Sequence, residues 1–266
     1  MGFDAIPEER RREIVRLLDD RGVVRVSDLS RIFDVSEMTI RRDLMALEEA
    51  GVLSRSHGGA VSHRRFEREP PYAQKGNRNI LQKQAIGRLA ATLVEEGETV
   101  FVNSGSTTLE VLRSLSVPEL RVVTSNAGAL SALSADDIEC VLAGGVYRRR
   151  SNSFVGGLAV LIIEQIYAAR CFIGVDGIDV EAGLSTPHHQ EAEIARLMIR
   201  RTRGPVVVLA DSSKIGGVSP FVTAPAVVAD ILVTDDGIPE ESVRAFEDVG
   251  VRVMIASTAD SVQNEQ

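Results

Sequence analysis

The segment VSEMTIRRDL, residues 35–44, holds the side chains whose types and spacing point most directly to chemistry. Ser36 can accept a hydrogen bond from a first-turn amide, and Glu37 follows where the helix dipole favours a negative charge. Arg41 and Arg42 carry planar guanidinium groups, which match phosphate oxygens and the acceptor pair on guanine. The segment therefore predicts a capped helix that contacts DNA.

Apolar spacing predicts the elements that position this helix. Its inward face carries apolar residues at steps of four and three, and an earlier helix is predicted over residues 8–20, ended by Gly22. A second helix is predicted over residues 28–33, capped by Ser27. The apolar residues of the inward face are Ile40, Leu44 and Leu47.

A hairpin is predicted after the third helix. Residues 52–56 and 60–61 flank His57-Gly58-Gly59, whose glycines allow positive backbone angles in a tight turn. Three helices followed by such a hairpin form a winged helix-turn-helix, which we expect over residues 1–62.

Residues 7–61 resemble the N-terminal DNA-binding domain of DeoR-type transcriptional regulators. The resemblance rests on REIVRLLDDRG, VSDLSRIFDVSEMTIRRDLMALEEAGVL and SRSHGGAV, in that order. It implies double-stranded operator DNA as a partner, and leaves open which contacts reach bases and which reach phosphates. The residues implied to face the operator are Ser36, Met38, Thr39, Arg41 and Arg42, with Arg55 and His57 on the wing.

The net charge of −8 is distributed unevenly along the chain. Residues 1–83 hold 16 Lys and Arg against 14 Asp and Glu, and the remainder holds 14 against 24, so the two parts carry +2 and −10. We expect local arginines to supply salt-dependent DNA contacts while the acidic remainder limits indiscriminate binding to polyanions. With neither an eighteen-residue apolar run nor a cleavable leader, we expect a cytoplasmic protein without a membrane partner.

The second part of the chain alternates short apolar strands with helices. Charged residues 63–79 include Pro70-Pro71 and predict a linker, after which residues 80–266 form the second domain. The alternation predicts a doubly wound, mostly parallel α/β sheet. The predicted strands are residues 99–102, 120–124, 139–142, 171–174, 206–209, 231–233 and 251–255. Cys140 and Cys171 fall in these strands and are expected to be buried thiols without chemistry.

Ligands of such sheets bind at the carboxyl ends of the strands, so the loops that follow the strands are candidate sites. The first loop combines hydroxyl groups with a helix N-terminus, which together can hold a phosphate without lysine. Ser and Thr also cap ordinary helices, so capping is an alternative explanation of the same residues. The loop consists of Asn103, Ser104, Gly105, Ser106, Thr107 and Thr108.

Three further groups of loop residues carry polar chemistry. Ser125, Asn126 and Ala127 supply either more donors or another N-cap, and Gly144, Gly145 and Arg148 place an arginine beside flexible backbone. This arginine and the two that follow it, Arg149 and Arg150, can meet a phosphate, a neighbouring subunit or water. Later loops add Asp176, Asp179, Glu191 and Lys214.

Residues 80–235 resemble the sensor domain of the same family, which is similar to ribose-5-phosphate isomerase. The resemblance implies that residues 104–108 cradle a phosphate, residues 125–127 flank it, and Asp176, Asp179, Glu191 and Lys214 line the sugar end. A phosphorylated sugar is then an effector, with no cofactor and no metal. This chain departs from the family at two places. The family often has aspartate where this chain has Asn103, and an acidic residue where this chain has His188-His189. The two adjacent histidine side chains are expected to point apart and not to form a metal site.

Two other functions compete with this interpretation. A sugar-phosphate isomerase with an accessory DNA-binding domain would use Asp176, Asp179 and Glu191 as acids and bases, but residues 180–190 lack the lysine and most of the glycines that the resemblance implies for such enzymes. A purely structural DNA-binding protein would leave the hydroxyl-rich loops without a purpose. We therefore expect a repressor that forms a homodimer or homotetramer. Its effector is expected to alter the geometry of the linker and so the spacing of the paired recognition helices.

Overall fold

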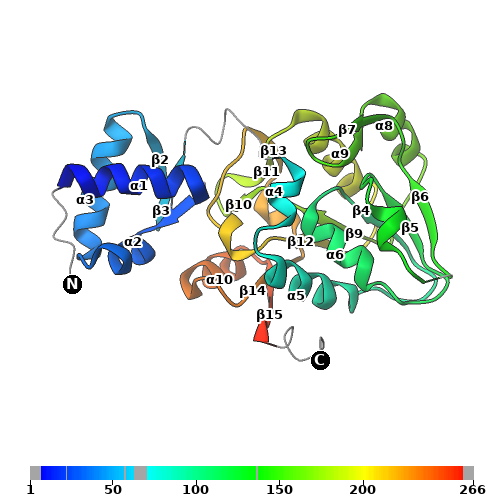
Figure 1. The fold of residues 1–266 in the computed structure, drawn as a ribbon. Helices are drawn as coiled ribbons and strands as arrows, with labels where there is room; N and C mark the ends of the chain where they lie inside the picture. The colour runs from blue at the N-terminus through cyan, green and yellow to red at the C-terminus, as the bar shows by residue number, and fades with distance from the viewer. Residues whose placement is uncertain (1–6, 22, 57, 63–70, 136, 260–266) are drawn as a thin grey trace.

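The computed structural model describes residues 7–21, 23–56, 58–62, 71–135 and 137–259 of the chain. It contains two bodies, a small N-terminal one that we call the head (residues 7–62) and a larger α/β domain (residues 71–259) beside it (Figure 1). The split matches the change from helical periodicity to alternating strands and helices along the sequence.

The head contains the three predicted helices and the predicted hairpin, to which a third strand that was not predicted pairs. Its sheet has the order β1-β3-β2, and residues including Ile14, Leu18 and Leu29 form its own core. The helices are α1 (Pro7–Arg21), α2 (Val26–Phe33) and α3 (Glu37–Glu49), and the strands are β1 (Val23–Arg25), β2 (Leu53–Ser56) and β3 (Gly59–Ser62).

The start of α2 differs from the prediction. Its N-cap is Arg25 and not Ser27, and no side chain accepts a hydrogen bond there. Arg25 is the last residue of β1 and keeps extended backbone angles, so the chain passes directly from strand to helix and Ser27 falls in the first turn. The side chain of Arg25 is consequently available for a contact outside the head.

Asp43 plays a role that the sequence did not reveal. Its side chain is only 3% exposed and accepts from Nε of Arg10 at 2.6 Å and from Nε of Arg11 at 2.9 Å. This ion-pair cluster ties α3 to α1, so the orientation of the third helix depends on a buried carboxylate.

The main sheet of the α/β domain has seven strands in the order β15-β14-β12-β9-β4-β5-β6, and all paired neighbours are parallel. All seven strands were predicted, since buried parallel strands are nearly continuous apolar runs. They are β4 (Thr99–Val102), β5 (Arg121–Thr124), β6 (Glu139–Leu142), β9 (Arg170–Gly174), β12 (Val206–Leu209), β14 (Ile231–Asp235) and β15 (Arg252–Ala256).

Helices cover both faces of this sheet. Successive strand residues point to opposite faces, so Val100 and Val102 pack with one set of helices and Phe101 with the other. The first set is α5 (Ile80–Ala91), α6 (Ser106–Ser114) and α7 (Ala129–Ala132); the second is α8 (Gly157–Glu164), α9 (His189–Arg200) and α10 (Glu240–Asp248). The doubly wound prediction is confirmed.

Several short elements were not predicted. The helix α4 (Tyr72–Gly76) lies inside the range expected to be a linker, and Figure 1 shows it next to a small antiparallel sheet on the side of the α/β domain that faces the head. That sheet has the order β10-β11-β13, with β10 (Gly177–Asp179), β11 (Gly183–Thr186) and β13 (Phe221–Ala224). The remaining elements are the hairpin β7 (Val146–Arg148) and β8 (Ser153–Val155), and the turns η2 (Ser212–Lys214) and η3 (Ala226–Val228).

The two cysteines differ in burial. Cys171 on β9 is buried, and burial raises the pKa of its thiol to about 12, whereas Cys140 on β6 is half-buried and not fully buried as expected. Neither forms a disulfide. Among the described helices, none is long and apolar enough to span a bilayer.

Candidate DNA interface and effector site

The helix α3 has one buried face and one exposed face. Ser36 accepts a hydrogen bond from the amide of Thr39 at 3.2 Å, which confirms the predicted N-cap. Ile40, Leu44 and Leu47 are buried as predicted. The opposite face presents Met38, which is 62% exposed, together with Arg41 and Arg42.

The exposed arginines differ in their local partners. Arg41 pairs with Glu37 one turn earlier at 3.2 Å, and Arg42 forms no ion pair with any residue of the described chain. Of the two wing candidates, Arg55 lies on β2, and His57 falls outside the described residues. The wing itself is the predicted hairpin, with Ser56 paired to Gly59.

Asn103 connects the ends of two neighbouring strands. Its Nδ2 donates to the carbonyl of Gly174 at 2.9 Å, and its Oδ1 accepts from the amide of Gly174 at 2.8 Å. An amide can donate and accept at once, whereas an ionised aspartate accepts only. This two-way bond explains the asparagine at a position where the resemblance implies aspartate.

The hydroxyl-rich loop, residues 103–108, is held in place from its buried side. The fully buried Thr108 donates to the carbonyl of Asn103 at 2.9 Å, and Nδ2 of Asn126 donates to the carbonyl of Gly105 at 3.0 Å. Ser104, Ser106 and Thr107 remain half-buried. Within the part of the chain that the structure describes, no side chain caps α6, so its first-turn amides face the loop without a capping acceptor.

The loop after β5 forms the adjoining wall. Ser125 is 1% exposed, and its hydroxyl has no hydrogen-bond partner among the described residues. The amide of Ala127 donates to the carbonyl of Asn152 at 3.0 Å, and the carbonyl of Ser125 accepts from Phe154 at 2.8 Å. These bonds join the predicted residues 125–127 to the β7–β8 hairpin.

The structure brings Arg148 and Glu191 together, although they are far apart in sequence. Nη1 of Arg148 lies 3.2 Å from Oε1 of Glu191, and the same oxygen accepts from Ser153 at 3.0 Å. A Cβ on Gly145 would lie 2.7 Å from the carbonyl of Val155, and its φ is +120°, so this turn requires glycine. Gly144 has no such neighbour.

The two predicted aspartates have different surroundings. Oδ1 of Asp176 lies 2.7 Å from Nζ of Lys75 on α4, and its Oδ2 accepts from Thr186 at 3.3 Å. Asp179 instead accepts from the amides of Glu181 and Ala182, both at 2.9 Å, and so closes the β10–β11 turn. Asp176 is the aspartate that meets a cation.

A second polar contact joins the segment after α4 to the loop after β12. Nδ2 of Asn79 donates to Oδ1 of Asp211 at 3.0 Å. Burial would raise the pKa of Asp211, but Lys214, the Ser213 hydroxyl and Lys83 outweigh it, so the pKa lies below its usual value. Asp211 therefore stays ionised next to the predicted Lys214.

Lys83 on α5 is buried, and its ammonium donates to the carbonyls of Lys75 and Arg78. Burial lowers its pKa from 10.5 to about 8. Sequence reasoning missed Lys75 because it lies in the predicted linker. A compositional signal was present, since the chain has three lysines against 27 arginines and all three, Lys75, Lys83 and Lys214, lie around this end of the sheet.

Comparisons with known proteins agree with this division of the chain. The model of the DeoR-like helix-turn-helix domain matches residues 10–66, and that of the DeoR C terminal sensor domain matches residues 78–236. The chain belongs to the DeoR family. We therefore call the α/β domain the sensor domain from here on.

Individual relatives match most of this chain. The chain is 37% identical over 254 residues to the HTH-type transcriptional regulator GolR of Listeria innocua serovar 6a, covering 94% of this chain and 99% of the relative. It is 35% identical over 213 residues to the lactose phosphotransferase system repressor of Streptococcus mutans serotype c, covering 79% and 84%. Ribose 5-phosphate isomerase A of Methanocaldococcus jannaschii aligns with a TM-score of 0.38 and 16% identity, covering 52% and 55%.

Membership in the DeoR family identifies the class of protein. These proteins are transcriptional regulators and not enzymes. The helix-turn-helix domain implies DNA binding, and the sensor domain implies a small-molecule effector.

The paired histidines of this family member depart from one expectation. The rings of His188 and His189 do not point apart, since their centroids lie 4.8 Å from each other with 31° between the planes. His188 is the extended N-cap of α9 and His189 its first helical residue, which places both rings on one side. Among the described residues, no cluster of three or more His, Cys, Asp or Glu side chains could hold a metal ion.

Proposed function

We propose that this DeoR-family protein represses a carbohydrate-metabolism operon and that a phosphorylated sugar bound to the sensor domain controls it. The repressor of the lactose phosphotransferase system among its relatives supports both the sugar and the sign of regulation. In this proposal, the exposed face of α3 enters the major groove, where arginine can read guanine. The operator contacts come from Ser36, Met38, Thr39, Arg41 and Arg42, with Arg55 and His57 on the wing.

The uncapped N-terminus of α6 is the observation that carries the phosphate part of the proposal. Its amides carry partial positive charge, and the neighbouring half-buried Ser104, Ser106 and Thr107 add hydroxyl donors. Ser125 adds a buried hydroxyl that lacks a protein partner among the described residues. These amides and hydroxyl groups suit a small anion whose surface is mostly polar.

Charged groups nearby suit the hydroxyl groups of a sugar. Asp176 follows β9, whose last residue, Gly174, is bonded to Asn103 at the start of the hydroxyl-rich loop. Lys214 lies on η2, and the Arg148–Glu191 pair is joined through Ser153 to the wall formed by residues 125–127. We assign Asp176, Glu191, Arg148 and Lys214 to the part of the site that binds the sugar. Asp179 has a different role, since it supports the β10–β11 turn.

Repressors with a helix-turn-helix bind half-sites about one helical turn apart through two-fold symmetry. We therefore propose a homodimer or homotetramer whose paired α3 helices occupy successive major grooves. Such a regulator acts where operator DNA is found, which places it in the cytoplasm.

The deciding experiment is a titration of the full chain against its own upstream DNA, with a panel of sugar phosphates and their unphosphorylated counterparts. We expect specific binding that weakens only with a phosphorylated sugar. Arg42→Ala should weaken specific binding by about 1–3 kcal/mol, the scale of one base contact. The control Arg16→Ala removes an exposed arginine from α1. Binding that ignores every sugar phosphate would refute the effector assignment, and equal affinities of the two variants would refute the role of Arg42.

A further inference from the structure

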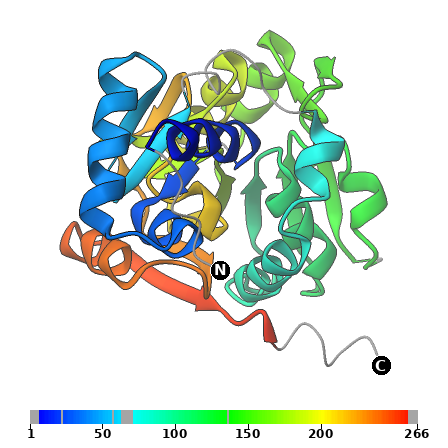
Figure 2. The same cartoon turned by 60° about the vertical axis from the view of Figure 1, so that its left-hand side comes forward.

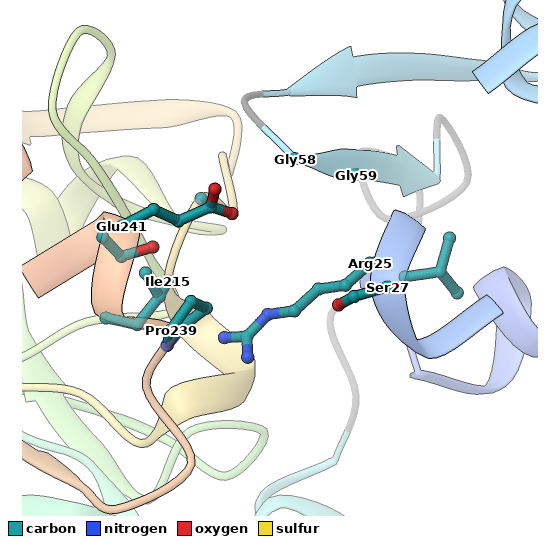
Figure 3. Close-up of a pocket in the computed structure, with 10 residues that line it drawn as sticks. Arg25, Ser27, Gly58, Gly59, Ile215, Pro239 and Glu241 are labelled. Atoms are coloured by element: carbon teal, nitrogen blue, oxygen red, sulfur yellow. The ribbon is translucent and has the colours of Figure 1, made fainter. Parts of the chain in front are cut away.

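The head and the sensor domain meet at the N-terminal end of α2. Arg25 donates from Nη2 to the carbonyl of Ser212 at 2.6 Å and from Nη1 to the carbonyl of Gly237 at 3.0 Å. Figure 3 shows the guanidinium group reaching from the head toward Pro239 and Ile215 of the sensor domain. One arginine thus bridges two domains that are joined by a separate stretch of chain.

The acceptors for Arg25 are fixed by a buried carboxylate. Asp235 is 2% exposed and accepts from the amide of Ser212 at 2.6 Å and from the amide of Gly237 at 3.0 Å. These are the same two residues whose carbonyls hold Arg25. A Cβ on Gly237 would lie 2.6 Å from Oγ of Ser212 and 2.8 Å from Oδ2 of Asp235, so a larger residue here would displace these side chains. The acceptor pair is therefore preformed within the sensor domain.

Gly58 of the wing faces the sensor domain at the same edge of the head. The amide of Val26 donates to the carbonyl of Gly58 at 2.8 Å, which holds the wing turn beside the start of α2. A Cβ on Gly58 would lie 3.1 Å from Oε1 of Glu241. Figure 3 shows Glu241 opposite Gly58, and Figure 2 shows α10, which carries Glu241, beside the head. The sensor domain therefore presents two carbonyls and one carboxylate to this edge.

The same edge is the part of a helix-turn-helix that meets the DNA backbone. The first helix of the motif crosses the backbone while the second enters the major groove, and arginines and helix N-termini bind phosphates. Here the first helix is α2, and Arg25 is its N-cap. Oxygens of the sensor domain occupy the side of α2 that phosphate oxygens would approach, while α3 lies toward the outer side of the head in Figure 1.

We propose that this contact is an autoinhibitory latch, formed by Arg25, Ser212, Gly237 and Glu241, in which the sensor domain competes with operator phosphates for the head. The inference rests on the proposed function of the chain. The latched form cannot place the start of α2 and the wing turn on DNA. Operator binding requires the two domains to separate, after which Arg25 contacts a phosphate.

The latch also connects the effector site to the DNA-binding domain. Ser212 lies between Asp211 and Lys214, in the loop proposed to meet the sugar, and Asp211 is itself bonded to Asn79 on the segment that leads to α5. A sugar phosphate that orders this loop fixes the carbonyl of Ser212 and so strengthens the latch. Effector binding then weakens operator binding, as an inducer does.

The test compares Glu241→Gln with Glu240→Gln in the full chain. Both variants remove one negative charge from α10, but Glu240 pairs with Arg244 of the same helix. We expect Glu241→Gln to lower the operator Kd by about threefold to fivefold, the scale of an exposed charge contact, and Glu240→Gln to leave it unchanged. Equal Kd values for the two variants would overturn the latch.

A second measurement needs no DNA. Amide hydrogen exchange of residues 24–28 should be faster in Glu241→Gln than in Glu240→Gln, because the latch shields the start of α2. Identical exchange would also overturn the proposal. If the unmodified chain fails to bind its upstream DNA, the proposed function fails, and this exchange comparison still decides whether the latch exists.

Arg25→Ala tests whether Arg25 leaves the carbonyls of the sensor domain and contacts a DNA phosphate. If Arg25 passes from the sensor domain to a phosphate, the slope of log K against log salt concentration should fall by about 0.9 in magnitude. Arg16→Ala, on the exposed side of α1, should keep the slope of the unmodified chain. An unchanged slope in Arg25→Ala would refute the phosphate contact.

Discussion

Nζ of Lys75 lies 2.7 Å from Oδ1 of Asp176, so the helix that follows the head-to-sensor connection is paired with the aspartate after β9. Both side chains are less than one-fifth exposed, which strengthens their attraction relative to a fully exposed pair. The connection between the domains therefore ends at the proposed sugar end of the effector site. Binding at Asp176 and the position of α4 are physically coupled.

This coupling predicts the behaviour of Lys75→Met. Loss of the ammonium group should raise the sugar-phosphate concentration for half-maximal release of operator DNA by about tenfold, the scale of one charged hydrogen bond. Operator affinity without effector should stay within about twofold, because Lys75 is remote from α3. Operator titration at increasing effector concentrations measures both quantities. Arg78→Met, which removes an exposed cation three residues further along the chain, is the control. Equal midpoints for the two variants would contradict the role of Lys75.

Asn103→Asp should destabilise the sensor domain. The aspartate cannot donate to the carbonyl of Gly174, and it places a charge at a position that is only 7% exposed. We expect a loss of about 1–3 kcal/mol in the free energy of unfolding, as for an unsatisfied buried group. Denaturant unfolding followed by circular dichroism checks this value, with the exposed Asn77→Asp as control. Equal stability of the two variants would show that the bond to Gly174 is dispensable.

Asp43→Asn should destabilise the head selectively. Removing one partner of a buried ion pair typically costs about 3–5 kcal/mol, because the remaining charge stays buried, and Arg10 would lose its carboxylate here. Amide exchange in α1 and α3 should therefore become faster, while exchange in the main sheet stays the same. The control is Asp34→Asn, an exposed left-handed position that asparagine tolerates well. Unchanged exchange in the head would contradict a structural role of Asp43.

Features that depend on local sequence patterns could be predicted, whereas contacts between residues far apart in the sequence could not. The seven parallel strands and the face of α3 were predictable because burial repeats at short, regular spacing. The partners of Asp43 were not, since Arg10 and Arg11 lie more than thirty residues away, and an aspartate on a helix usually faces solvent. The same reason applies to Arg148 and Glu191, which were both predicted for the site but not as a pair.

The small antiparallel sheet was missed for a different physical reason. Its strands have only three or four residues, two of them begin with glycine and the third lies between Pro220 and Pro225, so no alternation develops that a pattern could detect. The head-to-sensor contacts of Arg25 were also invisible, because they join residues about 190 to 210 positions apart through backbone carbonyls, which every residue possesses.

Lys83 predicts how stability changes with pH. The unfolded chain holds this proton up to the ordinary pKa of 10.5, whereas burial lets the folded chain release it near pH 8. Below pH 8, Lys83 is protonated in both the folded and the unfolded chain, so burial of its charge opposes folding fully. Between pH 8 and 10.5, the unfolded chain binds more protons than the folded chain, so the free energy of unfolding rises with pH. The free energy of unfolding of the unmodified chain minus that of Lys83→Met should therefore be flat below pH 8 and increase from pH 8 to 10. Denaturant unfolding of both proteins at pH 7, 8, 9 and 10 measures this difference, in which the other titrating groups cancel. A difference that stays constant over this range would show that Lys83 keeps its ordinary pKa in the folded protein.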